Sequence, residues 1–269
     1  MNTVHVSDRW ERGSPYEQYI GRWSRRIAPL FLAWLDQPAG KRWLDVGCGT
    51  GALSAAIHDH CAPASVMGVE PSEGFLKLAV QNLAGRARLL AGNAAAIPLD
   101  DGACDVVVSG LVLNFVPALP AALSEMKRVT ASDGTVAAYV WDYADGMEII
   151  KYFWDAAASL DSAAAQLHEG TRFPLCRPLA LEAALEEAGL TEVETTSLDL
   201  VAEFVDFEDY WRPFLGGQGP APTYAMSLPQ EQRATLRATL KSALPRAAGG
   251  SISLRARAWA VRGATRSDA

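Results

Sequence analysis

The chain has 269 residues, of which 49% are hydrophobic and 20% charged, and its formal net charge is −7. This composition predicts a folded chain with a full hydrophobic core and argues against disorder. A net negative chain lacks the positive surface that attracts nucleic acids and anionic membranes, so we expect neither as a partner.

The N-terminal region predicts a helix and no export signal. It lacks a basic stretch followed by an apolar one, and the apolar run PLFLAWL is too short to span a bilayer, so we expect a cytoplasmic protein. In SPYEQYIGRWSRR, Ser14 is a candidate helix cap and Pro15 suits the first turn. Tyr16, Tyr19 and Trp23 follow at helical spacing, and this aromatic face either packs on the body of the protein or covers a ligand.

Residues 41–143 alternate between short apolar runs and helical stretches. The predicted strands lie in KRWLDVG, SVMGVEP, RARLLAG, CDVVVSGLVLNFV and GTVAAYVWDY. The predicted helices between them are GALSAAIHDHC, EGFLKLAVQNLAG and PAALSEMKRVT, the second capped by Ser72 and stopped by Gly85. This alternation predicts a mostly parallel sheet covered by helices on both faces.

The pattern changes beyond Tyr143. It predicts an aromatic-rich helix in GMEIIKYFWDAAASL, a loop in HEGTRFPLCRP, a helix in LALEAALEEAGL, a strand in EVETTSLDLVAEF and a helix in PQEQRATLRATLKSAL. The final strand, SISLRARAWAVRG, alternates between its two faces and suits an antiparallel partner at one end of the sheet. No repeat or linker marks a second domain, so we expect a single domain over residues 1–269.

The glycine-rich stretch RWLDVGCGTGALS, residues 42–54, is the most informative motif. Its GCGTGA matches the G-x-G-x-x-G/A pattern of dinucleotide-binding turns. Asp45, however, would repel a pyrophosphate and suits a cationic group such as an ammonium. Glycines at 47, 49 and 51 leave room for a ligand directly against the backbone. The turn therefore favours a ligand with an ammonium, with an NAD-dependent oxidoreductase as the alternative.

The cysteines and histidines predict no metal site. None of the cysteines forms a C-x-x-C pair or a Cys/His ligand spacing, which favours small buried apolar side chains. His58 and His60 flank Asp59, but side chains two positions apart on a helix do not face the same way. The four cysteines are Cys48, Cys61, Cys104 and Cys176.

Four stretches resemble a known family in their order and spacing. They are WLDVGCGTGALS, VMGVEPSEGFLKLA, LLAGNAAAIPLDDGACDVVVSGLVLNFV and EMKRVTASDGTVAAYVWDY, and they cover about residues 41–143. The family is the class I S-adenosylmethionine-dependent methyltransferases, in their small-molecule, ubiquinone/menaquinone-methyltransferase-like branch. The resemblance implies an enzyme that takes a methyl group from S-adenosyl-L-methionine and leaves S-adenosyl-L-homocysteine. A protein that binds this cofactor without turnover is a further alternative.

The resemblance also implies a fold. It is an α/β, Rossmann-like, seven-stranded and mostly parallel sheet with an antiparallel closing strand, helices on both faces and a helical lid. The implied layout is an N-terminal helical cap in 1–40, a cofactor-binding core in 41–143, substrate-lid helices in 144–178 and 204–246, and a closing helix and strands in 179–203 and 250–263.

Particular residues acquire cofactor-binding roles through the resemblance. Asp45 and the backbone of Gly47 would hold the methionine ammonium, and Glu70 would accept hydrogen bonds from both ribose hydroxyls. Asn93 stands where the family usually has Asp beside the adenine amine. The implied cofactor-binding residues are Tyr19, Arg22, Asp45, Gly47, Gly49, Gly51, Glu70, Pro71, Asn93, Ala94, Ser109 and Leu111.

Aromatic residues recur where the family builds its acceptor pocket. They predict a small apolar or aromatic acceptor, or an amine held by cation–π contact, and the alternative is a lid with a small core of its own. The implied substrate-binding residues are Tyr16, Trp23, Trp141, Tyr143, Trp154, Phe173 and Trp211.

A general base is needed only where the acceptor must lose a proton. The candidates are Tyr16, Asp142, His168 and Glu169, and nothing in the sequence favours one of them. Whether oxygen, nitrogen or carbon is methylated, and whether the protein is a monomer or a homodimer, stays open.

Overall fold

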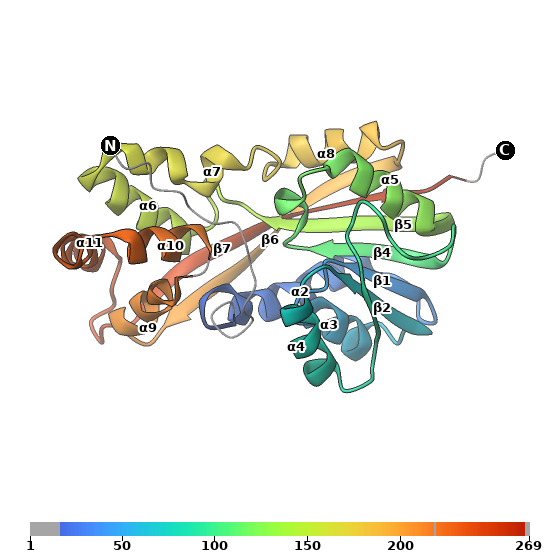
Figure 1. Cartoon of the computed structure of the whole chain (residues 1–269), viewed down its shortest axis with the longest axis horizontal. Coiled ribbons are helices and arrows are strands. Elements are labelled where there is room, and N and C mark those ends of the chain that lie inside the picture. Colours follow the sequence, from blue (N-terminus) through green and yellow to red (C-terminus); the bar gives the residue numbers. More distant parts are fainter. Residues whose placement is uncertain (1–16, 218, 267–269) are drawn as a thin grey trace. The chain divides into compact units, whose positions relative to one another are not determined.

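The structure is a computed structural model that describes residues 17–217 and 219–266 (Figure 1). Ser14, Pro15 and Tyr16 lie outside these residues, so the helix cap and both roles predicted for Tyr16 stay predictions. The chain folds into two compact units. We name them by their content, and the expectation of a single domain stays a prediction.

The glycine-turn unit comprises the described parts of Trp23–Val140, Leu175–Leu198 and Ala258–Ala269. The aromatic unit comprises the described parts of Met1–Arg22, Trp141–Pro174 and Asp199–Arg257.

Seven strands form one sheet in the order β3-β2-β1-β4-β5-β7-β6. Their bounds are β1 (Arg42–Val46), β2 (Ser65–Glu70), β3 (Arg88–Ala91), β4 (Cys104–Gly110), β5 (Thr130–Trp141), β6 (Thr191–Phe204) and β7 (Ile252–Ala264). Strands β1 to β5 pair with one another in parallel, and β7 is the antiparallel closing strand. The fold class expected from the sequence is therefore confirmed.

The central strands are apolar on both faces because helices cover both faces of the sheet. Trp43 and Leu44 of β1 and Val106 to Val108 of β4 are buried. The helices of the glycine-turn unit are α2 (Arg22–Leu35), α3 (Ala52–His60), α4 (Glu73–Leu83), α5 (Leu119–Val129) and α8 (Pro178–Glu187). Figure 1 shows α3 and α4 on one side of these strands and α5 and α8 on the other.

The helix boundaries follow from local signals in the sequence. The Ser72 hydroxyl accepts a hydrogen bond from the backbone N–H of Phe75 at the start of α4, as expected of a helix cap. Helix α4 ends where Ala84 and Gly85 take left-handed backbone angles. Both predicted limits of this helix are confirmed.

The aromatic unit is built from short helices. They are η1 (Glu17–Gly21), α6 (Glu148–Leu160), η3 (Ser162–Leu167), α7 (Glu169–Arg172), α9 (Phe207–Trp211), η4 (Arg212–Gly216), α10 (Pro220–Ser227) and α11 (Gln230–Ala243). The prediction of a continuous loop in HEGTRFPLCRP was wrong, because α7 makes one helical turn there. Its cap is His168, whose ring accepts from the N–H of Gly170, and histidine is not among the usual cap signals.

Across the described ranges 17–217 and 219–266, no helix has the length and hydropathy of a membrane span.

Candidate functional site

The carboxyl ends of four parallel strands gather the predicted site residues at one edge of the sheet. Asp45 lies near the end of β1, where it is in register with Gly68 of β2 and Val108 of β4. Glu70 is the last residue of β2, and Ser109 is the last but one of β4. Ligands of parallel α/β sheets bind at this edge, next to the central strands.

The three glycines of the turn have different roles. Gly47, Gly49 and Gly51 all have left-handed backbone angles, with φ of 75°, 54° and 88°. A Cβ at Gly47 would lie 2.6 Å from Val112 Cγ1, and one at Gly51 would lie 2.9 Å from Leu83 Cδ1. Among the described residues, the nearest atom that a Cβ at Gly49 would meet is the Gly47 carbonyl oxygen, at 4.0 Å. Gly47 and Gly51 therefore let neighbouring segments pack, while Gly49 leaves open space against the backbone.

Asp45 is a buried carboxylate with one oxygen unused. It is 1% exposed, and its Oδ2 accepts a hydrogen bond of 2.7 Å from the Ser54 hydroxyl. Its Oδ1 is buried and has no hydrogen-bond partner among the described residues. Burial raises the pKa of Asp45 to about 7, although the Ser54 hydroxyl acts to lower it. A buried acceptor of this kind calls for a positively charged donor.

Glu70 is held in one orientation by the backbone. Its Oε2 accepts from the N–H of Gly49 at 3.0 Å, and its Oε1 accepts from the N–H of Ser72 at 2.9 Å. Burial raises the pKa of Glu70, and these two hydrogen bonds oppose the rise. Each carboxylate oxygen can accept a further hydrogen bond, so Glu70 offers two adjacent acceptor positions at the end of β2.

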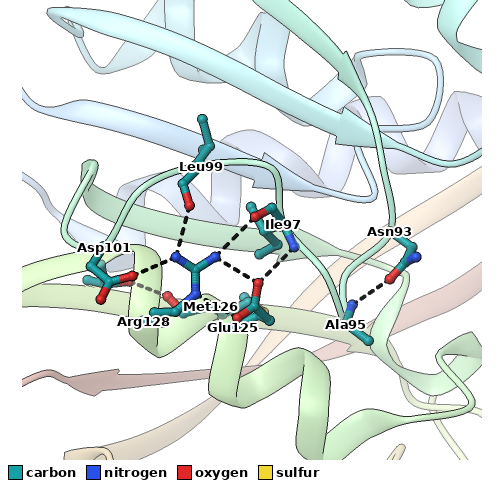
Figure 2. Close-up of polar contacts among 9 residues, drawn as sticks. Asn93, Ala95, Ile97, Leu99, Asp101, Glu125, Met126 and Arg128 are labelled. Atoms are coloured by element: carbon teal, nitrogen blue, oxygen red, sulfur yellow. Dashed lines mark hydrogen bonds and ion pairs between the residues drawn. The ribbon is translucent and has the colours of Figure 1, made fainter.

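The loop between β3 and β4 is braced by Arg128 of α5 (Figure 2). Its guanidinium donates to the carbonyls of Leu99 and Ile97 at 2.9 and 3.0 Å and to Asp101 at 2.7 Å. Arg128 also donates twice to Glu125, whose Oε2 accepts from the N–H of Ile97. The Arg128 donors lower the pKa of Glu125. This clamp holds the loop after β3, which contains Asn93.

Removing the clamp should loosen this loop. In Arg128→Met, two backbone carbonyls and two carboxylates lose their donor, and we expect a loss of about 2 kcal/mol of unfolding free energy. Thermal unfolding should show a midpoint lower by roughly 4 °C. The matched control is Arg42→Met, which removes the ion pair between Arg42 and Asp105. Arg42 is more exposed than Arg128, so this substitution should lower the unfolding free energy by about 1 kcal/mol or less. Equal losses in the two variants would contradict the clamp.

The other predicted cofactor-binding residues have partners of their own. Asn93 uses its Oδ1 to accept from the N–H of Ala95, which leaves its amide group free to donate (Figure 2). The Ser109 hydroxyl donates to the carbonyl of Val46 at 2.9 Å. Leu111 has φ of 63°, and its N–H donates to the carbonyl of Tyr139 at 2.7 Å. Pro71 is exposed and Ala94 is half-buried. Their contacts with a cofactor stay predictions.

Aromatic residues of the aromatic unit, several of them predicted to bind substrate, pack on one another. Phe153 stacks on Phe214 with ring centroids 4.7 Å apart and meets Trp154 edge-on at 5.2 Å. Tyr143 lies beside Phe173 at 6.1 Å. Trp211 and Tyr19 both contact Phe214, at 6.1 and 5.2 Å. These rings form a core within the unit, and whether they also bind substrate stays a prediction.

Three further predicted residues are placed individually. Trp23 is buried in the glycine-turn unit, where the Arg26 guanidinium lies over its ring. Trp141 is buried in the aromatic unit, and its Nε1 has no hydrogen-bond partner among the described residues. Arg22 forms an ion pair with Asp209 at 2.9 Å and lies over the ring of Phe204.

Three of the base candidates, Asp142, His168 and Glu169, lie in the aromatic unit, and whether any of them acts as a base stays a prediction. Asp142 is buried and accepts from the N–H of Asp145 in the turn after β5. Glu169 is buried and accepts from the indole N–H of Trp154. Burial lowers the pKa of His168. No group of three or more possible metal ligands occurs in the described part of the chain.

Three residues that support the site or the loop after β3 were not identified from the sequence. Ser54 orients Asp45, Arg128 braces the loop, and Asn114 carries a buried amide whose oxygen and nitrogen have no partner among the described residues. Ser54 stands nine positions after Asp45 on the buried face of α3, and a hydroxyl on such a face was the available signal. The spacing of Glu125 and Arg128 on one helix could have indicated the clamp.

Comparisons with known proteins agree with this geometry. A family model described as a methyltransferase domain matches residues 44–138. The malonyl-[acyl-carrier protein] O-methyltransferase of Geobacter sulfurreducens is 33% identical over 217 residues, covering 77% of this chain and 78% of that protein. The demethylmenaquinone methyltransferase of Geobacillus kaustophilus is 38% identical over 100 residues, covering 35% of this chain and 43% of that protein.

A solved structure shows the same fold. Phosphoethanolamine N-methyltransferase 2 of Haemonchus contortus, in complex with S-adenosyl-L-methionine, aligns with a TM-score of 0.58 at 15% identity. The alignment covers 94% of this chain and 56% of that one. The identity and coverage of the Geobacter relative show which family this chain belongs to. Membership of that family removes the alternatives of an oxidoreductase and of a protein without turnover. The chain belongs to the class I S-adenosylmethionine-dependent methyltransferases and is an enzyme that transfers a methyl group to a small substrate.

Proposed function

We propose that the carboxyl edge of β1 and β2 binds the methionine and ribose parts of S-adenosyl-L-methionine. The unused buried oxygen of Asp45 carries the proposal, because the cofactor's ammonium supplies the charged donor that this oxygen lacks. The two acceptor positions of Glu70 suit the two neighbouring ribose hydroxyls. The open space at Gly49 lets the cofactor lie against the backbone. The residues present therefore fit the cofactor.

The adenine end is assigned to the loop after β3. The amide group of Asn93 is free to donate to a ring nitrogen, and the backbone of Ala94 lies beside it. The Arg128 clamp holds this loop, which limits the entropy lost when the loop binds a ligand. Pro71 follows Glu70 directly and offers an exposed apolar ring.

Catalysis rests mainly on alignment of the two substrates. The sulfonium of the bound cofactor supplies an activated methyl group with a good leaving group. This chain's residues bind and orient the donor, and an in-line transfer needs the acceptor held at that methyl. We assign no general base. The named relatives are methyltransferases of malonyl-[acyl-carrier protein] and of demethylmenaquinone, and we propose a small apolar or aromatic acceptor here.

Calorimetric titration with S-adenosylhomocysteine and, separately, with NAD tests the cofactor site. Wild type should bind the first and not the second. Glu70→Gln should weaken the binding of S-adenosylhomocysteine by about tenfold, because one acceptor position becomes a donor. Glu182→Gln is the control, because Glu182 accepts from Thr195 and belongs to no predicted site. Binding of NAD, or of neither ligand, would remove the proposal.

The affinity for S-adenosylhomocysteine should fall as pH is lowered through about 7. In the free protein the pKa of Asp45 is raised to about 7, so below that pH the carboxyl is protonated and must release its proton to pair with the ammonium. The affinity should fall by up to about tenfold per pH unit. Titrations in buffers of different ionisation enthalpy should show this proton release, and Asp45→Asn should lack it. A pH-independent affinity would contradict the assignment.

A further inference from the structure

A buried amide to which the described part of the chain offers no hydrogen-bond partner follows the end of β4. Asn114 lies in the short helix η2 (Leu113–Phe115). Its Oδ1 and Nδ2 are both buried, and neither has a hydrogen-bond partner among the described residues. Burying an amide without partners costs free energy, and native structures seldom leave both of its atoms in that state. The amide therefore points to a ligand that supplies both a donor and an acceptor.

The backbone before Asn114 is strained and held from two sides. Leu111 has φ of 63°, which is costly for a residue with a side chain, and its N–H is tied to the carbonyl of Tyr139 on β5. Val112 packs against Gly47, where it occupies the space that a Cβ would need. The turn that carries Asn114 is thus fixed between β5 and the glycine turn. Strain that is held in place beside a ligand-binding turn is typical of functional sites.

The strand order places Asn114 on the methionine side of the cofactor. This step rests on the proposed cofactor site, in which the loop after β3 takes the adenine, Glu70 of β2 the ribose and Asp45 of β1 the ammonium. Strands β3, β2 and β1 are consecutive neighbours, and the next strand is β4. A cofactor laid out in this way runs towards β4 at its methionine end, where the methyl group is carried. The segment after β4 therefore lies on the side from which an acceptor approaches.

We propose that the carboxamide of Asn114 binds the methyl acceptor through a neutral hydroxyl, which donates to Oδ1 and accepts from Nδ2. A carboxylate could accept but not donate, and an ammonium could donate but not accept, so either would leave one amide atom unpaired. The segment LVLNFV around Asn114 is otherwise apolar. The acceptor class that fits is an apolar molecule bearing a hydroxyl, such as a phenol or a naphthol. Asn114 is a substrate-positioning residue and takes no proton.

The test compares naphthol (hydroxynaphthalene) with naphthalene, which lacks the hydroxyl. Both are titrated into the wild-type enzyme saturated with S-adenosylhomocysteine and into Asn114→Leu in the same complex. Wild type should prefer naphthol, and Asn114→Leu should lose about tenfold of that preference while binding naphthalene unchanged. Gln37→Leu is the control, since its amide donates to the carbonyl of Leu35 before β1, and it should keep the preference.

Two further readouts separate binding from a structural role. The affinity of Asn114→Leu for S-adenosylhomocysteine should match wild type. Its unfolding midpoint should be unchanged or higher, because the amide makes no hydrogen bond to the described residues that the substitution would remove. A lower midpoint with an intact naphthol preference would assign Asn114 to the fold and overturn the proposal. A weaker affinity for S-adenosylhomocysteine with that preference intact would assign Asn114 to the cofactor instead.

Three further outcomes would each overturn part or all of this inference. If neither probe binds the wild-type complex, the apolar hydroxyl class is wrong. If S-adenosylhomocysteine itself does not bind, the cofactor site fails, and this inference fails with it. If S-adenosylhomocysteine binds and the probes do not distinguish Asn114→Leu from wild type, only this inference is overturned.

Discussion

Asp45→Asn should weaken the binding of S-adenosylhomocysteine by at least about a hundredfold while making the free protein more stable at alkaline pH. The substitution keeps the size of the side chain and removes the charge that we assign to the cofactor's ammonium. Breaking a buried ion pair by removing one partner costs about 3 kcal/mol or more, which is at least roughly a hundredfold in affinity. Isothermal titration at about pH 8 measures this loss.

The gain in stability has the opposite physical origin. The pKa of Asp45 is about 7 in the folded chain against 3.8 for an ordinary aspartate, so the folded state holds a proton that the unfolded state releases. Stability therefore falls as pH rises from about 4 to about 7. Asp45→Asn has no carboxyl to ionise at this position, so its stability should not show this decrease between about pH 4 and about pH 7. Denaturant unfolding of both proteins across this pH range checks it.

The control for Asp45 is Asp105→Asn at the amino end of β4. Asp105 is paired with Arg42, and that pair lowers its pKa to about 2. Asp105→Asn should leave the affinity for S-adenosylhomocysteine unchanged. Relative to wild type, it should become less stable as pH rises above about 2, whereas Asp45→Asn should become more stable than wild type as pH rises. If Asp45→Asn binds S-adenosylhomocysteine as tightly as Asp105→Asn does, the assignment of the ammonium to Asp45 is wrong.

Gly47→Ala should disrupt both the fold of the glycine turn and cofactor binding. Alanine at a φ of 75° pays the strain of a left-handed backbone, about 1 kcal/mol. Its Cβ would also lie 2.6 Å from Val112, so the turn and the segment after β4 must separate. We expect about 3 kcal/mol less stability and at least about tenfold weaker binding of S-adenosylhomocysteine.

Gly40→Ala separates the effect of backbone strain from the effect of the clash with Val112. Gly40 has a φ of 79°, but no atom of residues 17–217 and 219–266 lies within 4 Å of a Cβ built there. This variant therefore carries the backbone strain without the clash, and it should lose only about 1 kcal/mol and keep its cofactor affinity. Thermal unfolding and calorimetric titration of both variants make the comparison. Equal losses would mean that strain alone, and not contact with Val112, makes glycine necessary at position 47.

The same contact links the cofactor turn to the proposed acceptor residue. Val112 stands two positions before Asn114 and packs on Gly47, so a shift of the glycine turn moves the segment that carries the amide. Gly47→Ala should therefore also reduce the naphthol preference. In the aromatic unit, by contrast, the rings of Phe153, Trp154 and Phe214 already pack on one another. Replacing one of these rings by alanine should therefore lower the free energy of unfolding more than it changes the preference for naphthol over naphthalene.

The sequence by itself determined the elements and the family. Strands, helices and the cap at Ser72 follow from side chains a few positions apart, because helix and strand periodicity and capping are local. The strand–helix alternation was sufficient to predict a parallel sheet. A parallel sheet brings the ends of its strands to one edge, and so Asp45 and Glu70 could be expected at one site.

Only the tertiary structure decided what the site residues and the residues that support them contact. Glu70 accepts from Gly49, Gly51 makes room for Leu83 of α4, and Arg128 clamps a loop about thirty positions earlier in the chain. The unused oxygen of Asp45 became evident in the same way. Burial and hydrogen-bond satisfaction depend on segments distant in sequence that pack together, and no local pattern records which segments meet.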